Sequence, residues 1–251
     1  MAWSEADSVR IQPSRRVMVM SSNSLMNYKI ERAVPLGDRA NFIASLCKGR
    51  CVMHLGCAAW PLTQQQLEDG TLLHLALSKA SRRVYGIDLC EEGLSFLRKR
   101  GFKDLIRWDV EKLDELRVEE PADVIVSGEI LEHLSNPGLF LQGISRLMKR
   151  EKSKLVISVP NAFSIRHFVP VMLRQTERVM DDHTAYYSFS TLRELLRRHD
   201  LRVSESYIFS NVGQGSSGFK RLLKRTMNAT LMHTFPQVSE GLMVVADVNE
   251  N

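Results

Sequence analysis

The sequence predicts an α/β protein with a doubly wound, mostly parallel seven-stranded sheet and helices on both faces. Two observations carry this prediction. Short apolar segments recur at regular intervals along the chain, and segments of helical periodicity lie between them. Such alternation is typical of strand–helix–strand units, in which each helix returns the chain to the start of the next parallel strand. A chain of 251 residues with 44% apolar content is large enough for one such domain with insertions.

The first part of the chain is expected to lie outside the sheet. Residues 1–27 are rich in Ser, Arg and Met and show no sustained period, so we expect a mobile N-terminal arm followed by a single domain over 28–251. A helical pattern at 38–47 precedes the first strand, at 51–56. Thr63 then begins a stretch with capping-box spacing, which predicts a short extra helix before the next regular one.

The rest of the domain repeats the same alternation. Further strands are predicted at 82–88, 104–109, 122–128, 154–160, 201–209 and 241–248. Further helices are predicted at 71–81, 91–100, 138–150 and 191–199. After Pro160 the rhythm changes, and we expect insertions at about 161–187 and 212–240.

Composition limits the compartment and the partners. The net charge is +5, but 34 basic residues stand among 29 acidic ones, so only a weak preference for anionic partners follows. The four cysteines lack zinc-knuckle spacing, which favours buried small residues in a reducing compartment; they are Cys47, Cys51, Cys57 and Cys90. The longest apolar stretches are too short for a membrane span and the N-terminus does not resemble a secretory signal, so we expect a soluble, cytoplasmic protein.

A basic segment at 219–235 carries basic and apolar residues at helical spacing. Such a segment can contact a membrane surface or nucleic-acid phosphates, and it can equally be a solvated helix face. No RNA-binding module or aromatic stacking platform is recognisable, which weakens the RNA interpretation.

Small and acidic residues stand where three predicted strands end. The first strand runs into Gly56, Cys57 and Ala58, which allow the backbone to approach a ligand at the carboxyl edge of the sheet. Asp88 ends the second strand, where a carboxylate can accept hydrogen bonds from both hydroxyls of a ribose. Asp109 ends the third strand. A plain turn and solvated carboxylates would explain the same residues.

The order and spacing of five segments resemble those of class I S-adenosylmethionine-dependent methyltransferases. The segments are CVMHLGCAAW, VYGIDL, IRWDVEKLDEL, EILEHL and ISVPN. The resemblance covers about residues 36–248 and is strongest to the branch with ubiquinone-type O-methyltransferases and methyltransferases of glycan and natural-product pathways. It implies a Rossmann-like fold and S-adenosylmethionine as cofactor.

The resemblance also implies a set of cofactor-binding residues. They are Gly56, Cys57, Ala58, Asp88, Leu89, Asp109, Val110 and Ser127. By this analogy the glycine turn faces the methionine part, Asp88 holds the ribose and Asp109 lies near the adenine. Three residues depart from the family pattern: His54 occupies a position that is usually acidic, and Ala58 and Trp60 replace the second and third glycines. Ala58 should still fit, whereas Trp60 does not allow the same close approach, so we expect the turn to be reshaped around the inserted helix.

The segment GEILEHL follows the fourth predicted strand. On a helix that begins near Gly128, the side chains of Glu129, Glu132 and His133 would share one face. The helix dipole favours carboxylates there, which alone would explain both glutamates. In many members of the family an EHL segment occurs without a metal, and the histidine orders the active-site wall.

His183, after the fifth strand and its insertion, is expected to return over the same sheet edge. Glu129, Glu132, His133 and His183 would then form an oxygen and nitrogen ligand set that suits Mg²⁺ or Mn²⁺. The pattern is similar to that of metal-dependent small-RNA terminal 2′-O-methyltransferases. In the metal-free alternative, His133 or His183, with Glu129 beside them, serves as general base.

The resemblance therefore implies an O-methyltransferase that acts on a hydroxyl of a small molecule or glycan precursor, including a metal-chelated vicinal diol. Two alternatives stay open: an RNA terminal ribose 2′-O-methyltransferase, and an inactive cofactor-binding or partner-binding module. Candidates for lining the acceptor pocket are Arg166, His167, Tyr186 and Tyr187.

Overall fold

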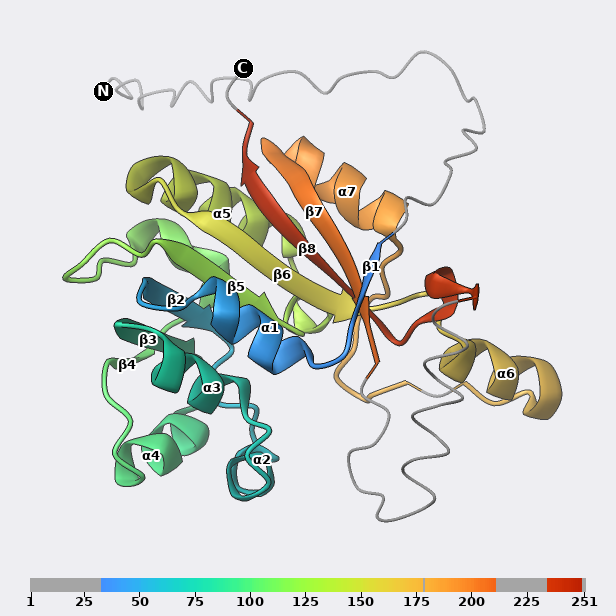
Figure 1. Cartoon of the computed structure of the whole chain (residues 1–251), viewed down its shortest axis with the longest axis horizontal. Coiled ribbons are helices and arrows are strands. Elements are labelled where there is room, and N and C mark those ends of the chain that lie inside the picture. Colours follow the sequence, from blue (N-terminus) through green and yellow to red (C-terminus); the bar gives the residue numbers. More distant parts are fainter. Residues whose placement is uncertain (1–32, 178, 211–233, 250–251) are drawn as a thin grey trace, which may run out of the picture.

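The computed structural model describes residues 33–177, 179–210 and 234–249, with an eight-stranded sheet at its centre (Figure 1). The strands are β1 (Val34–Leu36), β2 (Cys51–Leu55), β3 (Arg83–Asp88), β4 (Leu105–Arg107), β5 (Val124–Gly128), β6 (Lys154–Pro160), β7 (Leu201–Phe209) and β8 (Gly241–Val248). The α-helices are α1 (Arg39–Leu46), α2 (Thr63–Glu68), α3 (Leu73–Ala80), α4 (Glu91–Lys99), α5 (Pro137–Glu151), α6 (Ile165–Arg174) and α7 (Phe189–Arg198). Three 3₁₀ turns are η1 (Val110–Glu115), η2 (Leu131–His133) and η3 (Pro236–Val238).

The sheet has the order β1-β7-β8-β6-β5-β2-β3-β4. Strands β2 to β6 pair in parallel, whereas β8 is antiparallel to both β6 and β7. Parallel strands that meet side by side bring their carboxyl ends to one edge, so the turns after β2, β3, β4 and β5 lie together. This edge carries the candidate site.

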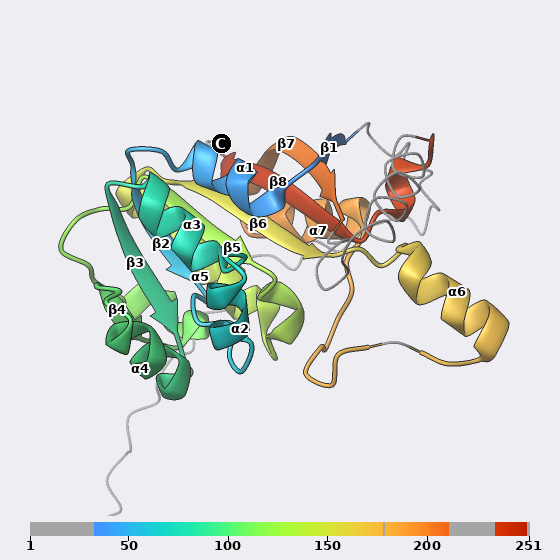
Figure 2. The ribbon, with the colours of Figure 1, turned by 60° about the horizontal axis from the view of Figure 1, so that its bottom comes forward.

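Helices cover both faces of the sheet, as the tilted view shows (Figure 2). On one face, side chains of α5 and α7 pack with those of the strands in the larger core cluster. On the other face, α1 and α3 pack against the same strands in a second cluster. The doubly wound, mostly parallel fold predicted from the sequence is therefore confirmed.

The predicted strand count of seven was one too low. The additional strand is β1, which pairs in parallel with β7 through only three residues, Val34↔Tyr207 to Leu36↔Phe209. Its sequence, VPL, is too short for a period of two and contains a proline, which a strand tolerates at the edge of a sheet. The extra helix predicted to begin at Thr63 is confirmed as α2.

Helix α6 lies within the insertion predicted at about 161–187, where the sequence indicated no helix. Pro170 lies inside it, and a proline within a segment counts against predicting a helix there. The predicted arm at 1–27 and most of the predicted insertion at 212–240 lie outside the described residues. So does most of the basic segment at 219–235.

The predicted burial of the cysteines is confirmed for Cys47, Cys51 and Cys57, whereas Cys90 is half-buried. Desolvation raises the pKa of the Cys47 thiol to about 12. A thiol with a raised pKa carries little thiolate, so its side chain behaves as a small core residue. No helix in the described part of the chain combines the length and the apolar character that a bilayer crossing needs.

Candidate functional site

The turn after β2 begins at Gly56, whose φ of 69° lies in the left-handed region that favours glycine. A Cβ at this position would lie 2.2 Å from Cδ1 of Ile130, so a larger residue would displace the segment after β5. The amides of Gly56 and Cys57 donate to the carbonyl of Ile87, at 2.8 and 3.2 Å, and join the turn to β3.

Asp88 fixes this turn from the end of β3. Its Oδ2 accepts the amide of Ala58 at 2.9 Å, and its Oδ1 accepts the amide of Cys90 at 2.9 Å. A carboxylate oxygen has more than one acceptor site, so Asp88 keeps acceptor capacity for the hydroxyls of a ribose. Ala58 is fully buried, and a Cβ on Gly93 of α4 would lie only 2.6 Å from its own Cβ.

The chain past Ala58 departs from a glycine-rich turn as the sequence indicated. Ala59 takes a positive φ of 51°, and the half-exposed side chain of Trp60 leads into α2. The close backbone approach is therefore confined to Gly56 through Ala58. Trp60 stands where the family pattern expects a further glycine, and α2 begins three residues later, at Thr63.

The other predicted cofactor residues lie at the same edge in different environments. Asp109 follows β4, and its Oδ1 accepts the amide of Glu111 at 2.9 Å at the start of η1. Val110 packs against the core, whereas the side chain of Leu89 is exposed. Ser127 is fully buried at the end of β5, and its hydroxyl oxygen has no hydrogen-bond partner among the described residues.

His54 forms a buried pair with His74. The two Nδ1 atoms lie 3.1 Å apart, and the rings stack with centroids 5.4 Å apart. Burial and the proximity of His74 lower the pKa of His54, and burial lowers the pKa of His74 to about 4. Both rings are therefore neutral near pH 7. His54, at a position that is usually acidic in the family, is part of the buried interior of this chain.

The segment after β5 does not form the α-helix expected to begin near Gly128. Glu129 has a positive φ of 57°, which interrupts helical geometry, while its amide still donates to the carbonyl of Ser158. One 3₁₀ turn, η2, follows, and α5 begins only at Pro137. The helical spacing argument for Glu129 was therefore wrong, whereas Glu132 and His133 do lie in one turn.

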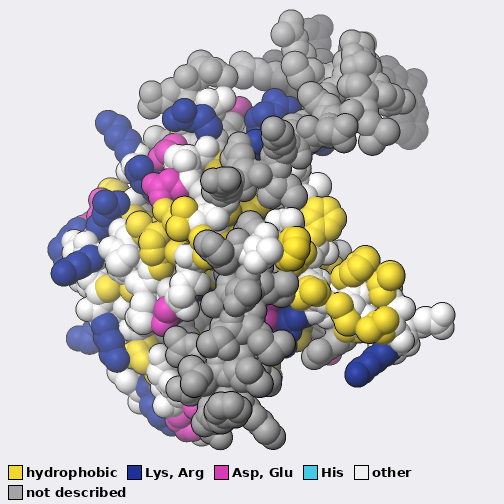
Figure 3. All heavy atoms as spheres, turned by 45° about the vertical axis from the view of Figure 1, so that its right-hand side comes forward, with side chains coloured by type: hydrophobic (Ala, Val, Ile, Leu, Met, Phe, Trp, Pro, Cys, Tyr) yellow, Lys and Arg dark blue, Asp and Glu magenta, His cyan; other side chains and the backbone are white. Residues whose placement is uncertain are grey.

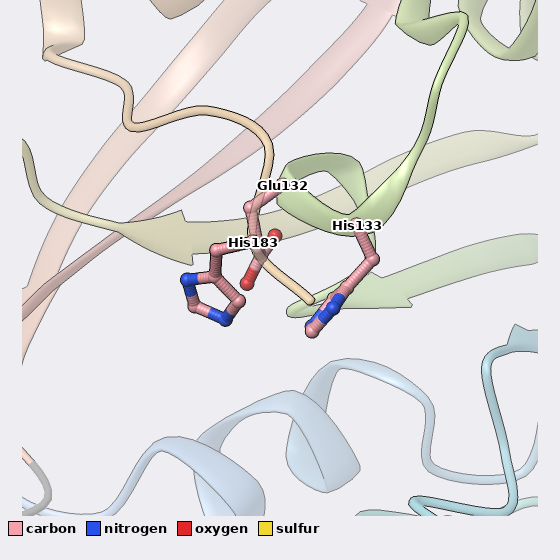
Figure 4. Close-up of side chains that lie close together, drawn as sticks. All are labelled: Glu132, His133 and His183. Carbon is pink, nitrogen blue, oxygen red and sulfur yellow. The ribbon is translucent and has the colours of Figure 1, made fainter. Parts of the chain in front are cut away.

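Glu132, His133 and His183 come together at this edge (Figure 4). One possible ligand atom from each of the three residues lies within 4.8 Å of the others. The rings of His133 and His183 meet edge to face, with centroids 4.6 Å apart. Two imidazoles and one carboxylate form a donor set that suits a divalent cation.

Glu132 is the buried member of this group. Its side chain is 0% exposed, and neither carboxylate oxygen has a hydrogen-bond partner among the described residues. Burial, and next the nearby Glu129, raise the pKa of Glu132 to about 9. An isolated buried carboxylate is costly, so this side chain is protonated at neutral pH unless a cation lies beside it.

Backbone contacts hold His183 against η2. The amide of Thr184 donates to the carbonyl of Glu132 at 2.7 Å, and the Thr184 hydroxyl contacts the carbonyls of Glu132 and Leu134 at 2.9 and 3.0 Å. Oδ2 of Asp182 lies 3.1 Å from Nδ1 of His133. Burial and the adjacent His133 lower the pKa of His183, which favours its neutral form.

Glu129 lies outside the group of three. Its carboxylate pairs with the guanidinium of Arg39 at 3.2 Å, and the same Arg39 nitrogen donates to the hydroxyl of Ser158 at 2.8 Å. The structure thus separates Glu129 from the other three predicted metal ligands. Sequence reasoning missed Arg39 and Thr184, because neither stands in a motif or at a distinctive spacing.

The predicted acceptor residues divide into two groups. The ring of Tyr186 lies near both His167 and His183, with centroids 4.8 and 5.8 Å apart, so these residues extend the cluster of imidazoles. Arg166 pairs with Glu240 at 2.8 Å, and Tyr187 is buried in the core. Of the four candidates, His167 and Tyr186 have the most direct connection to the cluster.

Comparisons with known proteins identify the family and the fold. A family model described as a methyltransferase domain matches residues 38–206. A ubiquinone biosynthesis O-methyltransferase from Xylella fastidiosa (strain 9a5c) is 30% identical over 105 residues, which cover 40% of this chain and 38% of that protein. The match thus spans less than half the length of this curated relative.

Two solved structures have a similar fold. A structure assigned as a methyltransferase from Bacillus halodurans C-125 is 13% identical, with a TM-score of 0.51, and 83% of this chain and 96% of that chain are covered. A chain from the complex between the Haloferax volcanii Trm112 methyltransferase activator and its methyltransferase partner is 17% identical, with a TM-score of 0.50 and coverage of 80% and 83%. The family model spans more than half of the sequence, and the chain belongs to the methyltransferase domain family, with the fold of class I S-adenosylmethionine-dependent methyltransferases.

Proposed function

We propose that this chain is an S-adenosylmethionine-dependent O-methyltransferase whose acceptor is a hydroxyl, preferably one of a vicinal diol, on a small molecule or glycan precursor. The observation that carries the finer part of the proposal is Glu132, a fully buried carboxylate without a hydrogen-bond partner in the described chain, beside two imidazoles. The O-methyltransferase named above supports transfer to oxygen.

The residues at the carboxyl edge fit the cofactor. Gly56 provides the close backbone approach, and Asp88 and Asp109 present carboxylates at the ends of the next two strands. S-adenosylmethionine would supply an electrophilic methyl group on its sulfonium sulfur. The protein's part is to hold the acceptor oxygen in line with that methyl group, since alignment accounts for much of the barrier.

The cluster also fits a divalent cation, because two imidazoles and a carboxylate are donors that such an ion prefers. Glu132, His133 and His183 would hold it, and Glu132 would lose its proton on binding. A cation held there would lower the pKa of a hydroxyl that contacts it. Without a cation, His133, which has Asp182 at its Nδ1, would accept the proton that the hydroxyl releases.

The first experiment tests binding. We expect calorimetry to detect S-adenosylhomocysteine binding to the full chain, and electron paramagnetic resonance to detect Mn²⁺ binding. Glu132→Gln should lower Mn²⁺ affinity at least about tenfold, as loss of a charged ligand does, and leave S-adenosylhomocysteine affinity within about twofold. Glu115→Gln, an exposed glutamate in η1, is the matched control and should change neither.

The second experiment tests turnover with a panel of catechols, sugar diols and matched mono-ols, followed by mass spectrometry of the products. We expect a singly O-methylated product from diols and reduced turnover in chelator. Full activity in chelator would refute the metal-dependent form and leave His133 as base. Methyl transfer only to a terminal ribose of an RNA oligonucleotide would favour the RNA alternative, and failure to bind S-adenosylhomocysteine would favour an inactive module.

A further inference from the structure

Helix α6 has the residue pattern of a core helix but lies on the surface. Five apolar residues follow the i, i+3, i+4, i+7, i+8 spacing that places side chains on one face of a helix, and we call them the apolar arc; they are Ile165, Phe168, Val169, Met172 and Leu173. Every one of them is exposed, up to 64% for Met172 and 77% for Leu173. The helix has no buried residue.

The polar side of α6 faces the protein instead. The ring of His167 contacts that of Tyr186, and the guanidinium of Arg166 pairs with Glu240. These contacts fix the orientation of the helix, so the apolar arc faces outward. Figures 1 and 2 show α6 projecting from the body of the molecule, and Figure 3 shows hydrophobic side chains gathered over this part of the surface.

The ionisable side chains within α6 are all basic, and one of them, Arg166, is paired with Glu240. No acidic residue occurs from Pro160 to Thr176, and the ionisable residues of α6 are Arg166, His167 and Arg174. An apolar face with a basic residue beside it, here Arg174, is typical of helices that lie in the interface of an anionic bilayer, where the basic side chain meets lipid phosphates. The net charge of +5 for the whole chain acts in the same direction.

The size and shape of the arc argue against a second copy as the occupant. A stable protein–protein interface takes about 20–30 residues from each side. The arc together with the neighbouring exposed Phe163 provides six residues on a projecting helix. Such a small convex surface suits shallow insertion between lipid head groups better than it suits a self-complementary dimer interface.

We propose that the apolar arc of α6 is a peripheral docking surface for anionic membranes. Phe168, Met172 and Leu173 would insert into the interface, with Arg174 at the level of the phosphates. Because Tyr186 connects His167 to His183, docking would hold the cluster of Glu132, His133 and His183 near the membrane surface. This inference does not depend on the reaction that the cluster performs.

The test is sedimentation of the full chain with vesicles of phosphatidylcholine alone and of an equal mixture of phosphatidylcholine and phosphatidylglycerol. We expect binding to the anionic vesicles that weakens with added salt, since exposed charges are screened. The double variant Phe168→Glu/Met172→Glu should lose binding by about a hundredfold, because each buried side chain contributes about a factor of ten or more.

Leu139→Glu is the matched control, because Leu139 is 50% exposed on α5 and lies outside the arc. It should bind vesicles as the unchanged chain does. Unchanged S-adenosylhomocysteine binding and an unchanged thermal midpoint would show that the double variant is folded. The proposal is overturned if the double variant binds vesicles as well as the intact chain does, or if the intact chain does not bind them. It is also overturned if ultracentrifugation shows that the intact chain is a dimer and the double variant is a monomer.

Discussion

At the scale of single residues, Thr184 determines where His183 lies. Its backbone amide and its hydroxyl both contact the carbonyl of Glu132, and the hydroxyl also contacts that of Leu134. These contacts join the loop before α7 to η2, two segments more than fifty positions apart in the sequence. The arrangement of Glu132, His133 and His183 therefore depends on a residue outside that group.

Replacing Thr184 by valine keeps the shape of the side chain and removes the hydroxyl. We expect a loss of about 1 kcal/mol of stability, which is the usual worth of a hydrogen bond, and Mn²⁺ binding that is about fivefold to tenfold weaker. Chemical denaturation and electron paramagnetic resonance would measure the two effects. Thr184→Ser keeps the hydroxyl and should retain most of the affinity for Mn²⁺. If the valine variant binds Mn²⁺ as tightly as the unchanged chain does, the hydroxyl does not position His183.

The candidate site was only partly predictable at this scale. Glu132 and His133 could be identified because they share one motif, and His183 because the order of elements returns that segment to the same edge. Arg39 could not, since its contact with Glu129 joins positions with no relation in the sequence. Glu129 itself was misplaced, because a positive φ in the middle of an apparent helix start is a tertiary feature that periodicity does not show.

At the scale of elements, the contact of α4 with the turn after β2 sets the shape of the cofactor edge. Gly93, in the first turn of α4, faces Ala58 so closely that a Cβ would lie 2.6 Å from that of Ala58. Ala58 in turn donates its amide to Asp88. A displacement of α4 would therefore move the Asp88 carboxylate, to which the proposed cofactor site assigns the ribose.

We expect Gly93→Ala to weaken S-adenosylhomocysteine binding about tenfold with little net change in stability. Alanine gains about 1 kcal/mol of helix propensity over glycine, while overpacking costs about 1–3 kcal/mol. Calorimetry and thermal unfolding would separate the two effects. Gly138→Ala is the matched control, because its nearest neighbour, a ring atom of His199, would be 3.8 Å away; unchanged affinity in both variants would contradict the proposed role of the contact.

Most elements were predictable because strands β2 to β8 are apolar runs bounded by turn residues, and helices α3, α4, α5 and α7 have regular apolar spacing. Strand β1 and helix α6 were not predicted. Strand β1 is too short to show alternation, and α6 directs its apolar side away from the core. A pattern shows that residues share a face but does not show which way that face points.

At the scale of the whole molecule, the buried Glu132 should make global stability depend on pH. Its pKa is about 9 in the folded chain and near its ordinary value of 4.5 when unfolded. Below 4.5 both states hold the proton. Between these values the unfolded state releases the proton while the folded state keeps it, so the free energy of unfolding falls as the pH rises towards 9.

Between about pH 7 and about pH 8 this effect outweighs that of the other groups with shifted pKa values. His54, His74, His183 and His199 have lowered pKa values in the folded chain, so they oppose this effect, but only weakly above their ordinary value of 6.5, where they are mostly neutral in both states. The cysteines titrate only near 9.0 when unfolded. In chelator, we expect urea unfolding to show a stability loss of up to about 1.4 kcal/mol over this interval. Glu132→Gln should remove most of the slope, and Glu115→Gln should keep it. Mn²⁺ should also flatten the dependence of stability on pH, because a bound cation displaces the proton from Glu132. If Glu132→Gln leaves this dependence unchanged, the carboxylate is already ionised in the folded chain.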